Sequence, residues 1–333
     1  MTGVPPADIL AEEARLLRLL ADSDGEVSVA RAAPRDSCAP FAEALGGLAE
    51  AGLVAIGADA RLRPGMRGSM LVASEVEEAL GECRFGRTLE IRATVDSTNA
   101  ALLARDPADT PVGATLVAEH QSAGRGRRGR SFDSRPGLGI WASVVLPPPS
   151  DSRRAPRLSL VAALAVARAL ESEAGVPARI KWPNDVRMDG RKVCGLLVEG
   201  RTAGGTLFPV VGFGVNVHHR PADFPSGLAS PASSLEMATG RSLPRSRILA
   251  AVLRELARAV DAEEAGELDL PAWFSRRDDL PGRSVVVEEG GSVLRGRSLG
   301  IDETGSLLLE TGTEGIVAVA NGDVSLKEEA GCS

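Results

Sequence analysis

Hydrophobic residues recur with different spacings along the 333-residue chain, and these spacings divide it into three parts. In residues 1–67, apolar residues return every three to four positions over Leu10–Leu20 and Phe41–Leu53, which is typical of amphipathic helices. Two short strand-like runs with a turn between them follow. This order predicts a winged helix-turn-helix-like domain over residues 1–67, joined to the rest of the chain by a linker helix within residues 68–83.

The central part, residues 84–277, alternates strand-like and helix-like segments. Leu207–Val217 is a long run of buried-type residues, whereas Leu158–Glu173 is rich in Ala, Leu and Val with helical spacing. The alternation predicts an α+β domain built on a mixed sheet. Residues 278–327 instead show short β runs separated by glycine turns, which predicts a small barrel, and residues 328–333 are expected to form a tail.

Composition argues against several classes of protein. The net charge of −7 argues against broad, nonspecific binding to nucleic acid. The longest apolar run, Leu160–Ala167, is far shorter than the ~20 residues of a membrane span, so no membrane association is expected. The four cysteines are widely scattered, which indicates neither a zinc site nor a disulfide framework and favours a reduced, cytoplasmic setting.

The segment Gly124–Arg130, called the Arg-Gly loop below, concentrates positive charge on an acidic protein. Its glycines leave room for backbone N–H groups to approach an anion, and its guanidinium groups can hold a carboxylate or a phosphate in a bidentate manner. The alternative is a surface tract that is merely solvated or touches nucleic acid. Its position between two buried-type strands favours a binding loop for a small anionic ligand.

Lysine is rare in this chain: the 38 basic residues include only three lysines, and Lys181 and Lys192 are two of them. The segment Lys181–Asp185 lies at a strand end, where ligands usually bind in α/β sheets, and Lys192 follows a tight turn at Gly190. The alternative is an ordinary Asn-Asp turn with exposed lysines. A compact ammonium near a carboxylate suits a site that handles phosphate and carboxylate together.

Polar side chains also cluster before a short helix, in Asp96–Asn99. Ser97, Thr98 and Asn99 are expected to cap that helix, and the same hydroxyl and amide groups can serve a polar ligand head, since a helix N-terminus supplies hydrogen-bond donors. Gln121, just before the Arg-Gly loop, can donate and accept hydrogen bonds at once. An exposed loop glutamine is the alternative.

Taken in order, these motifs resemble those of biotin protein ligases. The matching segments, which lie within residues 88–327, are Asp96–Asn99, Gln121, Gly124–Arg130, Lys181–Asp185, Gly190–Lys192 and Gly212–Asn216. Each motif has another explanation by itself, but the occurrence of all of them in this order is specific for the resemblance to this family. The resemblance implies a class II synthetase-like ligase domain over residues 84–277, which binds biotin and ATP, and an SH3-like β-barrel over residues 278–327.

The resemblance also implies a reaction with its cofactors and partners. Biotin and ATP, with Mg²⁺, would give biotinyl-5′-AMP and pyrophosphate, and the biotin would then pass to one lysine of a biotin carboxyl carrier protein. A ligase for lipoate or another acyl acid is the alternative within this fold, and the Arg-Gly loop and Gln121 argue against it. The protein is expected to be a monomer or a homodimer.

The expected site residues follow from the resemblance, position by position. The expected biotin-binding residues are Ser97, Thr98, Asn99, Gln121, Gly124, Arg125, Gly126, Arg127, Lys192 and Gly195. The expected ATP-binding residues are Arg125, Arg127, Lys181, Asn184, Lys192 and Asn216. Arg127, Lys192 and Asp185 are the expected catalytic residues, and Asp185 is also the candidate Mg²⁺ ligand.

A second role, as a biotin-responsive DNA-binding repressor, depends on residues 1–67. This part holds ten acidic residues and seven arginines, and its expected recognition helix, Cys38–Ala51, contains no basic residue. Contacts to phosphate supply most nonspecific affinity for DNA, so a helix without cations is a poor DNA reader. We therefore expect a mainly structural domain.

Overall fold

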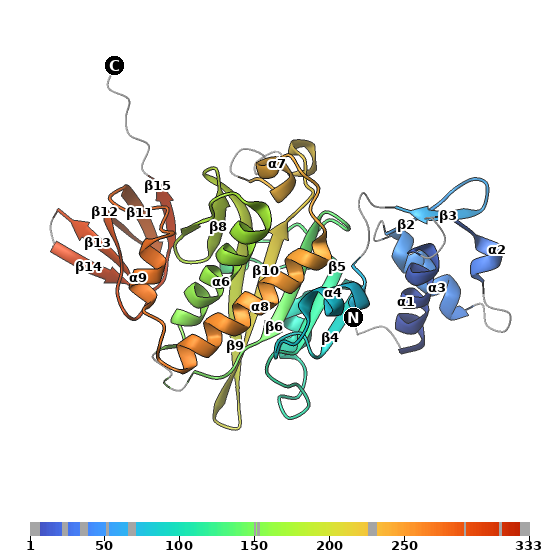
Figure 1. Cartoon of the computed structure of the whole chain (residues 1–333), viewed down its shortest axis with the longest axis horizontal. Helices are drawn as coiled ribbons and strands as arrows, with labels where there is room; N and C mark the ends of the chain where they lie inside the picture. Colours follow the sequence, from blue (N-terminus) through green and yellow to red (C-terminus); the bar gives the residue numbers. More distant parts are fainter. Residues whose placement is uncertain are drawn as a thin grey trace, which may run out of the picture.

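The computed structural model shows three parts that follow one another along the long axis of the molecule (Figure 1). The residues that it describes are 7–21, 26–33, 39–50, 53–65, 71–149, 151, 154–225, 232–289, 291–312 and 315–326. The expected tail, residues 328–333, lies outside them, as do Cys38 and Ala51 at the ends of the expected recognition helix.

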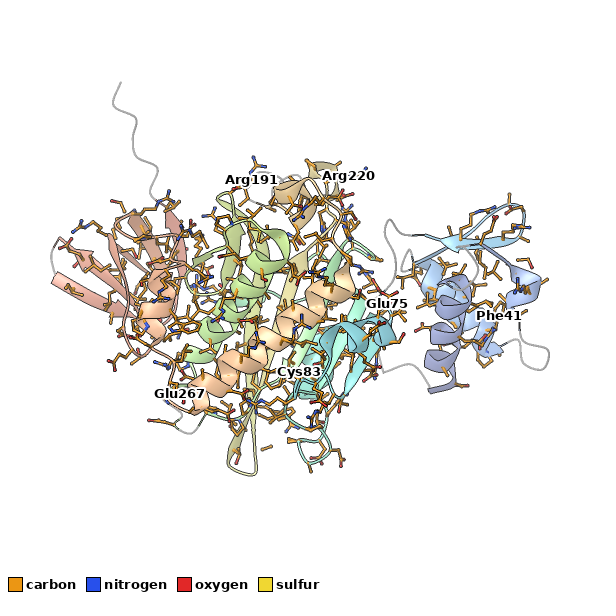
Figure 2. The ribbon with its side chains drawn as sticks, in the orientation of Figure 1. Phe41, Glu75, Cys83, Arg191, Arg220 and Glu267 are labelled. Atoms are coloured by element: carbon orange, nitrogen blue, oxygen red, sulfur yellow. The ribbon has the colours of Figure 1, made fainter. Side chains whose placement is uncertain are left out.

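A small helical unit forms the N-terminal end. Its elements are the helices α1 (Ala7–Ala21), α2 (Val29–Ala32) and α3 (Ala39–Glu50), and a three-stranded antiparallel sheet in the order β1 (Val27–Ser28), β3 (Arg61–Pro64), β2 (Val54–Ile56). Phe41, labelled in Figure 2, packs with Leu16, Leu48 and Leu62 in its core. The structure thus adds β1 to the expected strand pair. Ala93 of the central sheet belongs to the same core, so the unit is packed against that sheet.

The middle of the molecule is a seven-stranded mixed sheet. In spatial order its strands are β4 (Leu89–Val95), β5 (Thr115–Gln121), β6 (Gly139–Val145), β10 (Thr206–Asn216), β9 (Arg191–Ala203), β8 (Asp185–Met188) and β7 (Arg179–Lys181). β4 and β5 are parallel, and the remaining pairs are antiparallel. The mixed sheet predicted from the alternating pattern is confirmed.

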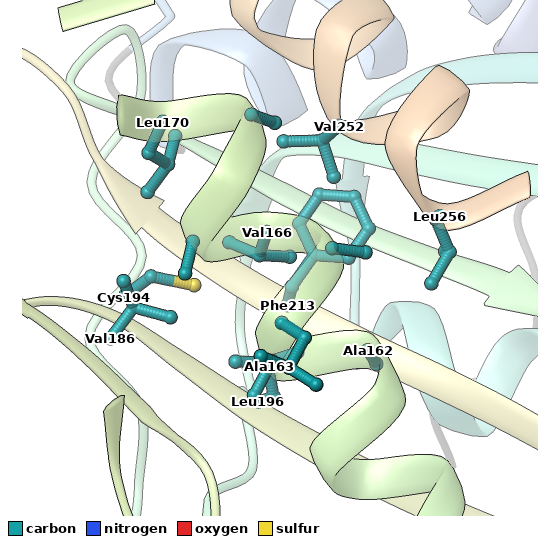
Figure 3. Close-up of a cluster of buried hydrophobic side chains, with 14 of the residues drawn as sticks. Ala162, Ala163, Val166, Leu170, Val186, Cys194, Leu196, Phe213, Val252 and Leu256 are labelled. Atoms are coloured by element: carbon teal, nitrogen blue, oxygen red, sulfur yellow. The ribbon is translucent and has the colours of Figure 1, made fainter. Parts of the chain in front are cut away.

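Helices cover both faces of this sheet. The long helices α6 (Arg157–Ala174) and α8 (Arg245–Glu264) pack on one face with α4 (Ala73–Leu80), and α5 (Thr98–Leu103) packs on the other. The many alanines of α6 let it approach its neighbours closely, and Val166, Phe213 and Val252 meet in the core between them (Figure 3). Within the described residues, no helix combines the length and the apolarity that crossing a membrane requires.

The observed α6 lies within one residue of the predicted helix at each end. The helix expected in the linker is α4, and it buries Val76 and Leu80 in the central core. Three shorter elements complete this part: α7 (Leu235–Thr239), α9 (Leu270–Ser275) and the 3-10 turn η3 (Pro221–Asp223).

The C-terminal part is a five-stranded antiparallel sheet. Its spatial order is β14 (Gly315–Val319), β13 (Leu307–Thr311), β12 (Ser292–Ile301), β11 (Ser284–Glu289) and β15 (Asp323–Leu326). Trp182, which is 2% exposed, donates from its indole Nε1 to the carbonyl oxygen of Gly305 over 2.9 Å. The segment that follows β7 is therefore anchored on the C-terminal sheet.

A buried ion pair stabilises the centre of the fold. Glu119 of β5 is 1% exposed, and its carboxylate accepts from Arg245 of α8 over 2.8 and 3.0 Å. It also accepts from the backbone N–H of Leu71 over 2.7 Å. One side chain thus joins the strand that leads to Gln121, the second long helix and the chain that arrives from the N-terminal unit.

We predict that Glu119→Gln lowers the free energy of unfolding by about 3–5 kcal/mol, because the buried charge of Arg245 would lose the carboxylate with which it pairs. Urea unfolding followed by circular dichroism measures this change. The control is Glu310→Gln, which removes the carboxylate of a half-exposed pair with Arg297 at 2.9 Å and should change the unfolding free energy by less than about 0.5 kcal/mol. Equal effects of the two substitutions would contradict the prediction.

Candidate active site

One cavity of about 520 Å³ collects nearly all of the expected site residues. Its lining includes Ser97, Thr98, Asn99, Gln121, Arg125, Gly126, Arg127, Lys181, Asn184, Asp185, Lys192, Gly195 and Asn216. Gly124 is the one expected residue that does not line it. A Cβ atom on Gly124 would lie 2.5 Å from the carbonyl oxygen of Phe132, so this glycine is required for the close approach of two backbone segments.

The N-terminus of α5 forms one wall of the cavity. Ser97 caps the helix, with its hydroxyl 3.5 Å from the backbone N–H of Ala100, and the N–H of Thr98 donates to Oε1 of Gln121 over 2.8 Å. Helix capping and a role in the cavity are therefore compatible. Gln121 is held at the end of β5 by this bond, instead of being an exposed loop residue.

Glycines on adjacent strands form the floor of the cavity. Gly195 of β9 pairs with Gly214 of β10. A Cβ atom on Gly214 would lie 2.4 Å from the ring of Phe132, and one on Gly195 would lie 2.8 Å from the Nζ atom of Lys192. The sequence analysis did not single out Phe132, whose one local signal is an aromatic ring two residues after Arg130, the last residue of the Arg-Gly loop.

The Arg-Gly loop is tied to the C-terminal sheet. Nη1 of Arg127 donates to the carbonyl oxygen of Gly322 over 3.1 Å. Asp323 of β15 pairs with Arg127 at 3.8 Å, with Arg128 at 3.5 Å and with Arg130. Asp323 also lines the cavity and was missed by the sequence analysis, because no local motif marks it.

The conformation of the loop depends on this attachment. The loop contains a short 3-10 turn, η1 (Arg127–Gly129), in which Arg128 has the left-handed angle φ 56°. Burial lowers the pKa of Arg127, and the nearby Asp323 carboxylate opposes that shift. The guanidinium remains positively charged, since an arginine side chain does not lose its proton in proteins.

A second carboxylate, Asp185, pairs with one lysine of the cavity and acts electrostatically on the other. β8 and β9 form a hairpin whose turn has the left-handed angles predicted for a tight turn, φ 47° at Asp189 and φ 71° at Gly190. The hairpin places Nζ of Lys192 2.6 Å from Oδ1 of Asp185. Burial lowers the pKa of the Lys181 ammonium, and the charge of Asp185 opposes that shift.

Two amides hold the outer wall of the cavity. Asn184 donates to the carbonyl oxygen of Leu196 over 2.6 Å and accepts from Arg127 over 3.3 Å. Asn216 donates to the carbonyl oxygen of Ser233 over 3.0 Å. The cavity therefore has a polar, hydrogen-bonding end at α5 and a cationic end between the Arg-Gly loop and the lysines. Such cations can stabilise negative charge that develops when two anionic groups react.

Comparisons with known proteins agree with this geometry. Residues 91–216 match the biotin/lipoate A/B protein ligase family, and residues 282–327 match the biotin protein ligase C-terminal domain. Fold and site thus define a protein of the biotin/lipoate ligase class. Residues before 91, including the N-terminal unit, lie outside both matches.

Individual relatives narrow the class. The chain is 31% identical to the bifunctional ligase/repressor BirA of Bacillus subtilis over 78% of this chain and 82% of that protein. It is 34% identical to the biotin–[acetyl-CoA-carboxylase] ligase of Mycobacterium tuberculosis over 74% of this chain and 92% of that protein. The biotin protein ligase of Aquifex aeolicus, solved with biotin and ATP, superposes with a TM-score of 0.63 at 30% identity. The superposition covers 72% of this chain and 99% of that protein. The chain belongs to the biotin protein ligase family and is an enzyme of the ligase class.

We predict that Asp323→Asn loosens the Arg-Gly loop, because three guanidinium groups lose their shared counter-charge. Trypsin, which cuts after arginine, should cleave within Gly124–Arg130 about fivefold faster, the effect of ~1 kcal/mol on local opening. Glu310→Gln serves as the control and should leave that cleavage rate unchanged. An unchanged rate in Asp323→Asn would show that the loop is held by other contacts.

Proposed function

We propose that this protein is an ATP-dependent biotin protein ligase. It activates biotin as biotinyl-5′-AMP and transfers the biotin to one lysine of a biotin carboxyl carrier protein, such as the carrier domain of acetyl-CoA carboxylase. The observation that carries the proposal is the single cavity with a hydrogen-bonding end and a cationic end. The names of the M. tuberculosis relative and of the A. aeolicus complex support the same substrates.

The polar end of the cavity would receive the biotin ring. Its ureido group offers both N–H donors and a carbonyl acceptor, and hydroxyl and amide groups match both. The residues assigned to biotin are Ser97, Thr98, Asn99, Gln121, Gly124, Arg125, Gly126, Arg127, Lys192 and Gly195. All of these residues except Gly124 line the one cavity, which supports the assignment.

The cationic end would carry the chemistry. An oxygen of the biotin carboxylate attacks the α-phosphorus of ATP, the bond to the β-phosphate oxygen breaks, and pyrophosphate leaves. Bringing two such anions to 4 Å costs ~4 kcal/mol per pair of unit charges at an effective dielectric of 20. Arg127 and Lys192 are assigned to hold the two reacting groups and offset this repulsion.

The second step needs a nucleophile from the carrier. The ε-amine of the carrier lysine attacks the acyl carbon of the mixed anhydride, the acyl–oxygen bond breaks, and AMP leaves. No side chain of this protein becomes acylated in this scheme. Arg125, Lys181, Asn184 and Asn216 are assigned to the nucleotide, together with Arg127 and Lys192.

Mg²⁺ is part of the proposal through the nucleotide. Among the described residues, no group of three or more His, Cys, Asp or Glu side chains could hold a metal ion. The site fits the usual mode for this ion, in which one or two carboxylates act together with substrate phosphates and water. Asp185 is the candidate ligand, and Mg²⁺ would there neutralise phosphate charge. Asp185 is equally placed to orient the acceptor lysine.

We infer that the N-terminal unit has a mainly structural role. The N-terminal unit is assigned as winged-helix-like, with β2 and β3 as the wing, and the C-terminal sheet as an SH3-like barrel. DNA binding as in the ligase/repressor relatives is disfavoured by α3, which carries no basic residue. A gel shift with the protein's own upstream DNA at low salt, with biotin and ATP present, tests this. A cytoplasmic monomer or homodimer without membrane contact completes the proposal.

The assay that tests the proposed function is ATP–pyrophosphate exchange with biotin, with lipoate and with neither acid. We expect exchange with biotin alone, followed by labelling of one lysine in an apo carboxyl carrier domain. Exchange with lipoate in its place would identify the alternative ligase. If neither acid supports exchange, the Arg-Gly loop would instead be interpreted as a surface that binds polyanions.

We predict that Gly124→Ala increases the release of biotinyl-5′-AMP into solution, because a Cβ atom there displaces the loop that should cover the intermediate. The steady-state rate of AMP formation per enzyme molecule, measured without carrier, should rise about tenfold. Gly46→Ala is the matched control, since a Cβ atom at Gly46 meets nothing within 4 Å. Equal release from both variants would count against the covering role of the loop.

A further inference from the structure

A continuous path of hydrogen bonds runs beneath the polar end of the cavity. It joins, in order, Gln121, Thr98, Ser143, Asn99, Glu199 and Arg125. Ser143 of β6 is fully buried, and Glu199 lies on β9. Neither was singled out by the sequence motifs. The path connects the residues assigned to the biotin ring with the first arginine of the Arg-Gly loop.

Glu199 fixes which way the Asn99 amide points. Nδ2 of Asn99 lies 2.8 Å from Oε2 of Glu199 and 3.2 Å from the carbonyl oxygen of Leu197. Both partners can only accept hydrogen bonds, so the NH₂ group must face them. Oδ1 of Asn99 then faces Ser143. Gly212 makes room for this arrangement, since a Cβ atom there would lie 2.4 Å from that Oδ1.

The direction of donation follows along the path. Oγ of Ser143 lies 2.7 Å from Oδ1 of Asn99, which can only accept, so Ser143 donates its one proton to Asn99. Oγ1 of Thr98 is 2.7 Å from the same Ser143 oxygen. Because Ser143 has a single proton, which we place on the bond to Asn99, we assign the proton between the two hydroxyl oxygens to Thr98.

Gln121 competes weakly for the Thr98 proton. Its Oε1 lies 3.1 Å from Oγ1 of Thr98, farther than Ser143, and it already accepts the N–H of Thr98 at 2.8 Å. With its proton committed to Ser143, Oγ1 of Thr98 offers only lone pairs to the cavity. The wall therefore presents a hydrogen-bond acceptor at this point, next to the amide of Gln121.

We propose that Glu199 is a positioning residue that determines selectivity for the ureido ring. Through Asn99 and Ser143 it makes Thr98 an acceptor for a ring N–H, a group that a dithiolane ring lacks. Through Arg125, at 3.1 Å, the same carboxylate oxygen links the ring site to the Arg-Gly loop. This inference rests on the proposed function and adds a determinant of substrate choice to it.

The test compares Glu199→Gln with wild type in biotin-dependent ATP–pyrophosphate exchange. A glutamine can donate as well as accept, so the orientation of the Asn99 amide would be fixed only by its longer contact with the carbonyl oxygen of Leu197. We expect the KM for biotin to rise about tenfold, the effect of one lost hydrogen bond, and kcat to change less than about threefold. The preference for biotin over an analogue with ring oxygens in place of the ureido N–H groups should fall by a similar factor.

Ser143→Ala is the second variant, because it breaks the same path from the other side and leaves the contact between Glu199 and Arg125 intact. It should raise the KM and lower the preference in the same way. The KM of the double variant should exceed that of the more severe single variant by no more than about twofold, since both substitutions act through Asn99. Glu310→Gln is the control and should match wild type.

Each outcome decides the inference. A wild-type enzyme without biotin-dependent exchange overturns the proposed function, and this inference with it. An active wild type with unchanged KM and unchanged preference in both variants overturns the inference alone. A raised KM with an unchanged preference assigns Glu199 a merely structural role and also overturns it.

Discussion

Repulsion between like charges is the constraint around which the site is built. Several cations converge on one cavity: Arg125, Arg127, Arg130, Lys181 and Lys192. Each close pair of them costs free energy, and more so where burial reduces solvent screening. Three carboxylates offset this cost: Asp185 pairs with Lys192, Glu199 pairs with Arg125, and Asp323 pairs with three arginines of the loop. Because Asp323 belongs to the C-terminal sheet, that sheet is part of the site and not an appendage.

The same arrangement requires backbones to come unusually close. Gly195 and Gly214 are paired across two strands and form a floor on which Phe132 and Lys192 rest. Side chains at these positions would collide with both. The hydrophobic core beneath, between α6, α8 and the sheet, holds these strands in place (Figure 3). Packing in the core thus determines how precisely the charged groups above it are placed.

Charge accounts for the reaction, whereas hydrogen-bond polarity accounts for the choice of acid. In the proposed reaction, the cations serve the joining of a carboxylate to a phosphate, and the ring end of the cavity recognises the rest of the acid. Here that end is lined by groups whose donors and acceptors are oriented by Ser143, which is buried, and by Glu199, which is partly exposed. Orientation by such partners is what turns a polar wall into a selective one.

The sequence by itself determined the elements and the contiguous motifs. Helical spacing predicted α6 to within a residue, and the alternating pattern predicted the mixed sheet. The Arg-Gly loop and Lys181–Asp185 were recognisable because their chemistry is concentrated in a few neighbouring residues. Lys192 was expected to point back into the site of the Lys181–Asp185 segment because it follows a tight turn, and the structure places it in contact with Asp185.

Only the tertiary structure decided the remaining partners. Asp323 meets Arg130 across 193 positions of sequence, and Glu199 meets Asn99 across 100. Nothing local distinguishes such a carboxylate from the many that are exposed to solvent, because its role comes from which strands lie side by side. Strand order and register depend on burial summed over the whole sheet, and no short motif encodes that sum.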